Sequence, residues 1–150
     1  MSGPIIWTIG YEQATVAGVI AVLTAAHVEV LADVRALPLS RRPGFSKSAL
    51  ASALGEAGIE YRHFKALGTP ADGRAAARAG RHSDLQRIYA GQLELPEALA
   101  AGAQLAELAR EKRVALLCYE RAAQVCHRTL LREAMLAEFA QIDLIPSDTG

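Results

Sequence analysis

The sequence has little cysteine and no long apolar run. Only 2 of its 150 residues are cysteines, too few for a disulfide framework, so we expect reduced thiols and a cytoplasmic protein. No apolar stretch approaches the roughly 20 residues of a membrane-spanning helix. No basic segment followed by an apolar run begins the chain, so we also expect no signal peptide. These absences argue against a membrane as partner.

An excess of one charge is also missing, because 16 basic residues balance 16 acidic ones. Zero net charge argues against a general nucleic-acid binder, although a nucleic-acid partner stays open. The balance is uneven, since residues 35–87 hold 10 Lys and Arg against 4 acids, a net of +6. Arginine outnumbers lysine by 13 to 3, and its guanidinium suits two-point binding of phosphate or carboxylate. The local charge indicates an anionic small molecule or a nucleotide as ligand.

Apolar runs alternate with helical patterns along the whole chain. The expected strands cover residues 5–9, 28–34, 59–64 and 114–119, with a short fifth at 142–145. The expected helices cover residues 16–23, 46–57, 84–89, 96–112 and 126–140, and residues 68–82 are expected to be a Gly/Ala/Arg-rich loop. Candidate helix signals are the caps Thr15 and Ser46, the stop Gly58 and the first-turn Pro96. This alternation predicts one α/β domain over residues 1–150, three-layered, with a mainly parallel sheet of four to five strands.

Polar side chains follow each expected strand. The first strand leads into Gly10, Tyr11 and Glu12, the second into Asp33 and Arg35, the third into His63 and Lys65, and the fourth into Cys118, Tyr119 and Glu120. In parallel sheets ligands bind beyond the carboxyl ends of the strands. The sequence therefore predicts one site at this edge of the sheet.

The segment from Cys118 to Arg128 holds the densest chemistry. It joins a buried strand to a helix N-terminus, where unpaired N–H groups and the helix dipole favour an anion. The candidate catalytic residues are Cys118, Glu120 and Cys126, because a thiol near a helix N-terminus tends to become a reactive thiolate. A buried cysteine that only packs is the plain alternative. Seven residues between the cysteines is not a usual zinc spacing, so we expect no metal and no other cofactor.

Asp33 and Arg35 stand two apart at a strand end and therefore face the same side. They form either a local ion pair or a device in which Asp33 orients Arg35 toward an anion. Arg41 follows Ser40 in a proline-stiffened loop, which loses less ordering entropy on binding than a flexible one. The arginines of residues 74–81 are expected to be solvated, with a lid as the alternative. The candidate ligand-binding residues are Gly10, Tyr11, Asp33, Arg35, Ser40, Arg41, His127 and Arg128.

With these motifs in view, the chain resembles a bacterial family known as domain of unknown function 488. The matching residues are Thr8-Ile9-Gly10, Asp33-Val34-Arg35 with Pro38, Ser40, Pro43 and Phe45, Gly58-Ile59 with Tyr61, Leu67-Gly68, and Cys118-x-Glu120 followed by Cys126-His127-Arg128. The resemblance implies a compact α/β fold with a common pocket, and it implies no activity. Members often carry a His-Ser pair where this chain has Tyr11-Glu12, and a second glycine where it has Thr69. A fainter likeness is to rhodanese-type sulfurtransferases, although the loop after Cys118 is Ala-rich rather than Gly-rich.

The leading hypothesis is a small cytoplasmic enzyme that binds a phosphate-bearing or nucleotide-like ligand. Arg35, Arg128 and the helix N-terminus would hold the anion. Cys118 or Cys126 would be nucleophile or redox centre, with Glu120 as acid, base or orienting group. Two alternatives stay open: a non-catalytic module for a nucleotide or nucleic-acid end, and a thiol redox switch. The sequence names neither substrate nor oligomeric state.

Overall fold

The computed structural model describes residues 4–119 and 127–146. Within these ranges the strands form a single parallel sheet in the order β3-β2-β4-β1-β5. The strands are β1 (Ile5–Gly10), β2 (Val30–Asp33), β3 (Glu60–His63), β4 (Val114–Cys118) and β5 (Ala140–Leu144). The expected α/β class with a parallel sheet is confirmed.

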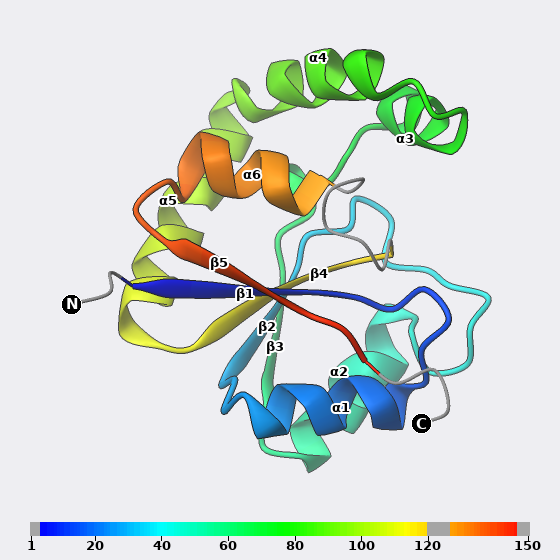
Figure 1. The fold of residues 1–150 in the computed structure, drawn as a ribbon, viewed down its shortest axis with the longest axis vertical. Coiled ribbons are helices and arrows are strands. Elements are labelled where there is room, and N and C mark those ends of the chain that lie inside the picture. The colour runs from blue at the N-terminus through cyan, green and yellow to red at the C-terminus, as the bar shows by residue number, and fades with distance from the viewer. Residues whose placement is uncertain (1–3, 120–126, 147–150) are drawn as a thin grey trace.

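Helices cover both faces of this sheet (Figure 1). They are α1 (Val16–Ala25), α2 (Lys47–Glu56), α3 (Ala71–Arg78), α4 (His82–Leu93), α5 (Pro96–Glu111) and α6 (His127–Met135), with a short 3₁₀ turn, η1 (Lys65–Leu67). From β1 to β3 the chain moves along the sheet in one direction, and from β3 to β5 it moves back. Right-handed crossovers therefore place α1 and α2 on one face and α3 to α6 on the other.

Each face of the sheet has its own apolar core. Successive residues of a strand point to opposite faces, so Ile6 and Leu116 belong to the core under α5 and α6. Trp7 and Leu117, their neighbours in sequence, belong to the core under α1 and α2. The central strands are apolar at nearly every position because both of their faces are buried.

Local signals in the sequence set most helix ends. Thr15 accepts a hydrogen bond from the Gly18 N–H at 3.0 Å and caps α1. Pro96 lies in the first turn of α5, and Gly58 follows α2 with a φ of +78°. Ser46 precedes α2 as expected, but its hydroxyl accepts from the Ser40 N–H at 3.1 Å and makes no cap bond.

The expectation of a loop over residues 68–82 is wrong, because Ala71–Arg78 is helical. Alanine and arginine are strong helix formers, and Asp72 in the first turn and Arg78 in the last suit the helix dipole. Gly73 does not break this helix, since it is tightly packed: a Cβ atom there would lie 2.5 Å from the Thr69 side chain and 3.2 Å from Ile88 on α4.

Two other helices differ in length from the expectation. Helix α4 spans His82–Leu93, longer than the expected 84–89. The last helix ends at Met135 rather than at residue 140, because the chain there enters β5. In the described part of the chain, no helix combines the length and apolar character needed to cross a membrane.

Candidate ligand-binding site

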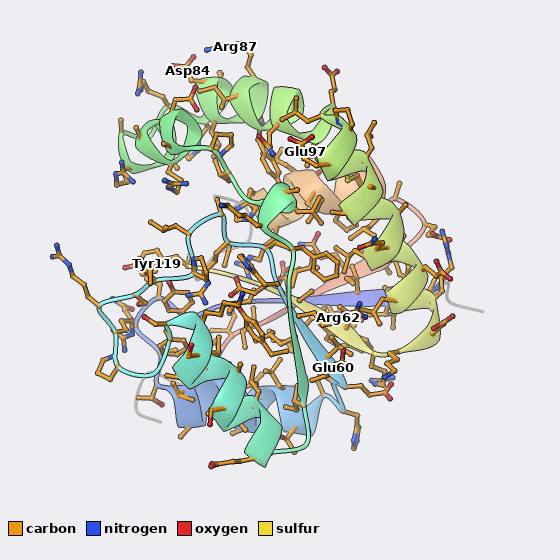
Figure 2. All side chains as sticks on the ribbon, turned by 180° about the vertical axis from the view of Figure 1, so that it is seen from behind. Glu60, Arg62, Asp84, Arg87, Glu97 and Tyr119 are labelled. Carbon is orange, nitrogen blue, oxygen red and sulfur yellow. The ribbon has the colours of Figure 1, made fainter. Side chains whose placement is uncertain are left out.

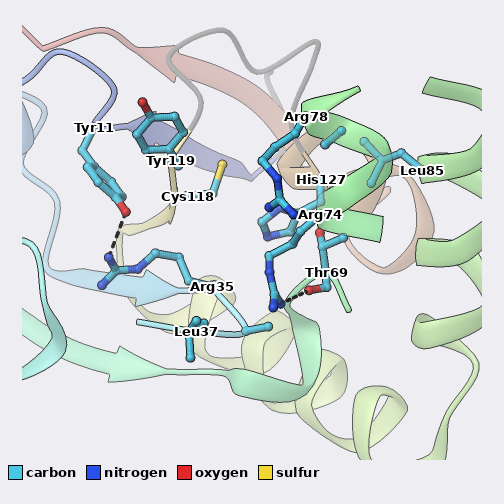
Figure 3. A pocket seen from close by; sticks show the side chains of 12 residues that line it. Tyr11, Arg35, Leu37, Thr69, Arg74, Arg78, Leu85, Cys118, Tyr119 and His127 are labelled. Carbon is cyan, nitrogen blue, oxygen red and sulfur yellow. Dashed lines mark hydrogen bonds between the residues drawn. The ribbon is translucent and has the colours of Figure 1, made fainter. Parts of the chain in front are cut away.

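A pocket of about 260 Å³ opens at the carboxyl edge of the sheet (Figure 3). Its described lining residues are Tyr11, Arg35, Ala36, Leu37, Thr69, Arg74, Ala77, Arg78, Leu85, Cys118, Tyr119 and His127. Strands β1 and β4 are neighbours, but the helices that follow them lie on opposite faces. Such a reversal leaves a crevice at the strand ends, and ligands bind there in open α/β sheets.

A buried ion pair forms the floor on the β2 side. The Arg35 Nε donates to Asp33 Oδ1 at 2.8 Å, and Nη2 donates to Oδ2 at 2.7 Å. Asp33 is fully buried and Arg35 is 6% exposed. Asp33 ends β2 and Arg35 follows two positions later, so both side chains point to the same side and can make this two-point contact.

Arg35 has further partners on both sides of its guanidinium. Its Nη1 donates to the Tyr11 hydroxyl at 3.2 Å and to the Phe45 carbonyl at 2.7 Å. With the two bonds to Asp33, four of the five side-chain N–H groups are engaged. Burial alone would lower the pKa of Arg35, but the hydrogen bonds and charge of Asp33 outweigh it and raise the pKa. Arg35 is therefore a fixed cation with one N–H left for a ligand.

Strand β3 supports this pair from the outside. The Tyr61 hydroxyl donates to Asp33 Oδ2, and burial together with the Asp33 carboxylate raises the pKa of Tyr61. His63 Nε2 lies 2.8 Å from the Arg35 carbonyl oxygen. A carbonyl oxygen only accepts, so this ring nitrogen carries the proton and donates.

The β4 and α6 side contributes Cys118 and His127. Cys118 is 1% exposed and disulfide-bonded. His127 Nε2 donates to the Val34 carbonyl at 2.7 Å. Burial lowers the pKa of His127 to about 4, although the bond to Val34 acts in the opposite direction. At neutral pH the ring is therefore uncharged, with its proton on Nε2 and an acceptor at Nδ1.

Helix α3 supplies two more arginines on the opposite wall (Figure 3). Arg74 and Arg78 are four residues apart and therefore lie on the same helix face. Arg74 Nη1 donates to the Thr69 carbonyl at 2.9 Å. Within the described residues, Arg78 makes no hydrogen bond or ion pair and its side chain is exposed. Both side chains line the pocket and keep N–H donors that no described residue engages.

Gly68 brings this wall close to the loop after β2. A Cβ atom at Gly68 would lie 2.1 Å from the Ala36 backbone nitrogen. Any side chain would push the two segments apart, so the close approach requires glycine at this position. The packing of Gly68 on Ala36 thus sets the width of the pocket between the α3 arginines and the β2 loop.

Aromatic and apolar side chains line the mouth of the pocket. Tyr11 stacks on Phe45 with ring centroids 4.5 Å apart. Tyr119 meets the Tyr11 ring edge-on at 5.4 Å. Tyr119 is 48% exposed and Leu37 is 55% exposed. The mouth therefore offers apolar surface next to cationic surface.

The structure brings together four of the residues proposed from the sequence, since Tyr11, Arg35, Cys118 and His127 line the pocket. Asp33 and Arg128 are fully buried and are not among its lining residues. Gly10 ends β1 beside Cys118. Ser40 and Arg41 lie in the β2–α2 loop outside the lining. Glu120 and Cys126 lie outside the described residues.

Two features of the site differ from the sequence-based interpretation. The expectation of reduced thiols is wrong for Cys118, which is disulfide-bonded. The arginines of residues 74–81 are expected to be solvated or to form a lid, and two of them, Arg74 and Arg78, line the pocket from α3. Their four-residue spacing is the signal that a helix assignment would have given. Over the described residues, no cluster of three or more His, Cys, Asp or Glu side chains could hold a metal ion.

Comparison with known protein families places the chain. A family model described as domain of unknown function DUF488 matches residues 15–135. The chain belongs to the DUF488 family. No curated protein and no solved structure matches the chain. In this DUF488 protein, the matched region includes the Asp33–Arg35 pair, the Gly68 contact and the α3 arginines, so most of the pocket wall lies within the family's shared region.

Proposed function

We propose that this DUF488 protein binds a small phosphate-bearing anion in the pocket at the carboxyl edge of its sheet. One observation supports this proposal above the others. Three guanidinium groups, those of Arg35, Arg74 and Arg78, line the pocket, and no carboxylate is among its described lining residues. Guanidinium groups bind phosphate through paired, charge-assisted hydrogen bonds, which are stronger than neutral ones.

The three arginines have different parts in this proposal. Arg74 and Arg78 hold unengaged donors and contact the anion directly. Arg35, whose charge is already paired with Asp33, contributes its one remaining N–H and fixes the Tyr11 hydroxyl. That hydroxyl accepts from Arg35, so its own proton is available to an oxygen of the ligand.

The size of the pocket favours a metabolite over a nucleic acid. Its volume of about 260 Å³ lies slightly below the roughly 300–1,000 Å³ of sites for drug-sized ligands. A nucleic-acid surface instead presents many phosphate contacts along a groove. A small phosphate ester is therefore the ligand that this pocket fits best.

A second candidate function is thiol chemistry, because Cys118 lines the same pocket. Its disulfide would first have to accept two electrons and two protons from a dithiol, which yields two thiols. The probe is dithiothreitol, followed by iodoacetamide labelling and titration with phosphate. We expect Cys118 to be alkylated only after reduction. A phosphate affinity that is the same in both redox states would contradict a redox switch at this site.

The main proposal is tested by isothermal titration calorimetry with inorganic phosphate. We expect Arg78→Ala to remain folded and to lose about tenfold or more in affinity, because a hydrogen bond to a charged group is worth about 1.5–3 kcal/mol. The matched control is Arg87→Ala on α4. Arg87 is 72% exposed beside Asp84, and both lie on the outer side of α4 (Figure 2).

The control variant should bind phosphate as the wild-type protein does. Equal losses in Arg78→Ala and Arg87→Ala would show only a general effect of net charge. No phosphate binding by the wild-type protein, in the oxidised or the reduced state, would contradict the proposal.

A further inference from the structure

The pocket has an apolar end as well as a cationic one. We propose that its ligand is a phosphate ester of the nucleoside monophosphate class. The organic part of this ligand carries a planar ring, which packs on Tyr119. This inference rests on the proposed function and deepens it, because phosphate binding alone would not require the apolar end. The geometry of the mouth, the placement of the arginines and the pocket volume each support it.

Tyr119 is an aromatic side chain held in place at the mouth. Its ring meets Tyr11 edge-on, with an interplanar angle of 83°. Tyr11 is itself fixed by stacking on Phe45 and by the hydrogen bond from Arg35. A ring that is anchored on one side and 48% exposed loses little conformational entropy when a second ring packs against it.

Leu37 adds apolar surface at the same opening. Two of the seven large hydrophobic side chains that are exposed among the described residues, Leu37 and Tyr119, line this one pocket. An inorganic anion or a bare sugar phosphate would leave both in water. A planar ring stacked on Tyr119 would bury part of this apolar surface, and every nucleobase has a face that stacks on an aromatic side chain.

Two of the three lining arginines lie across the pocket from Tyr119, whereas Arg35 lies beside Tyr11. Figure 3 shows Tyr11 and Tyr119 on one side of the opening and Arg74 and Arg78 on the other. A ligand that reaches both ends needs a ring and a phosphate separated by a short linker. The ribose of a nucleoside monophosphate is such a linker.

The volume sets an upper size for this ligand. At about 260 Å³ the pocket is small for a ligand site, so one base, one sugar and one phosphate fit the space better than a dinucleotide. The described lining carries no acidic side chain near the arginines that would repel a dianionic phosphate.

The test compares four probes by isothermal titration calorimetry: inorganic phosphate, ribose 5-phosphate, adenosine 5′-monophosphate and uridine 5′-monophosphate. We expect at least one nucleoside monophosphate to bind about fivefold or more tightly than ribose 5-phosphate, the lower bound of a stacking contribution. Tyr119→Ala should remove that difference, because it should weaken nucleotide binding more than ribose 5-phosphate binding. Tyr119→Phe should retain it, because the ring and not the hydroxyl makes the contact.

The exposed apolar control is Leu99→Ala, since Leu99 is 56% exposed on α5 and does not line the pocket. It should bind all four probes as the wild-type protein does. Ribose 5-phosphate binding as tightly as both nucleotides, or Tyr119→Ala weakening all probes equally, would overturn this inference and leave the proposed function standing. If none of the four probes binds, both proposals fail.

Discussion

Arg35 and Arg78 line the same pocket, but they differ in burial and in hydrogen bonding. Arg35, after β2, is 6% exposed and has four of its five side-chain N–H groups engaged by Asp33, Tyr11 and Phe45. Arg78, on α3, is exposed and makes no hydrogen bond or ion pair within the described residues. Arg35 therefore stabilises the fold, whereas Arg78 is available to bind a ligand.

This difference separates stability from binding within one site. A buried charge depends on its partner, because removing that partner leaves the charge without compensation. An exposed guanidinium is still hydrated in the folded protein, so its removal changes the free energy of unfolding little. Changes in the Asp33–Arg35 region should therefore alter folding first, and changes on α3 should alter ligand affinity first.

The largest expected effect is that of Asp33→Ala on stability. It leaves the buried Arg35 guanidinium without its carboxylate, which costs about 3–5 kcal/mol in the free energy of unfolding. Urea denaturation measures this loss. Asp33→Asn should lose less, because its amide oxygen can still accept from the Arg35 backbone N–H and Nε, although the amide nitrogen cannot accept from Arg35 Nη2 or the Tyr61 hydroxyl. The control is Asp84→Ala, which removes the exposed carboxylate that pairs with Arg81 and Arg87. It should lower the free energy of unfolding by less than about 1 kcal/mol. Similar losses for Asp33→Ala and Asp84→Ala would break the comparison.

The next effect is a pH dependence that comes from His127. Its pKa of about 4 in the folded protein lies below the ordinary 6.5, so the unfolded chain binds the proton more tightly. The stabilisation is therefore fully present above about pH 6.5 and is lost as the pH falls toward 4, by roughly 3 kcal/mol in total. His127→Gln should show a shallower slope of unfolding free energy against pH over this range. Equal slopes in the two proteins would contradict the assignment, and exposed His82→Gln on α4 is the control.

Tyr61→Phe should have a smaller effect on the buried region. The substitution removes the hydroxyl that donates to Asp33 Oδ2 and keeps the ring. We expect a loss of about 1.5 kcal/mol, the lower end for a hydrogen bond to a charged group, because Tyr61 is only half-buried. Phosphate affinity should hardly change, since Tyr61 does not line the pocket. A large loss of affinity without loss of stability would place Tyr61 in binding rather than in support.

The smallest stability effect should come from α3. Arg78→Ala removes an exposed side chain that the described protein does not engage, so the free energy of unfolding should change by less than about 0.5 kcal/mol. The thermal midpoint without ligand measures this directly. A destabilisation as large as that of Tyr61→Phe would show that Arg78 supports the fold.

The sequence predicted the sheet better than it predicted the pocket. Apolar runs such as residues 114–117 are decided by local burial, and their strands were correctly located. Helix α3 is not predicted because Gly73 and Gly80 look like breaks, whereas Gly73 lets α3 pack closely on Thr69 and on Ile88 of α4, 2.5 and 3.2 Å from where a Cβ atom would lie. That requirement exists only once the two helices pack, so a single sequence does not reveal it.

The candidate site shows the same limit. The pairing of Asp33 with Arg35 follows from their spacing at a strand end, and the structure has that contact at 2.7 Å. The disulfide state of Cys118 does not follow from spacing, because it depends on whether the fold brings the two sulfur atoms of the chain within bonding distance. Tyr119 and Leu37 likewise line one pocket only because the fold brings the end of β4 close to the loop after β2.

The most direct measurement follows the arginine side-chain N–H signals by NMR during a titration with inorganic phosphate. We expect the Arg74 and Arg78 signals to shift in a saturable way. The Arg35 Nε–H, which donates to Asp33, should already be protected from exchange without ligand and should move least. Saturable shifts at Arg35 with unchanged signals at Arg74 and Arg78 would contradict the account, because the buried cation would then be the one that binds.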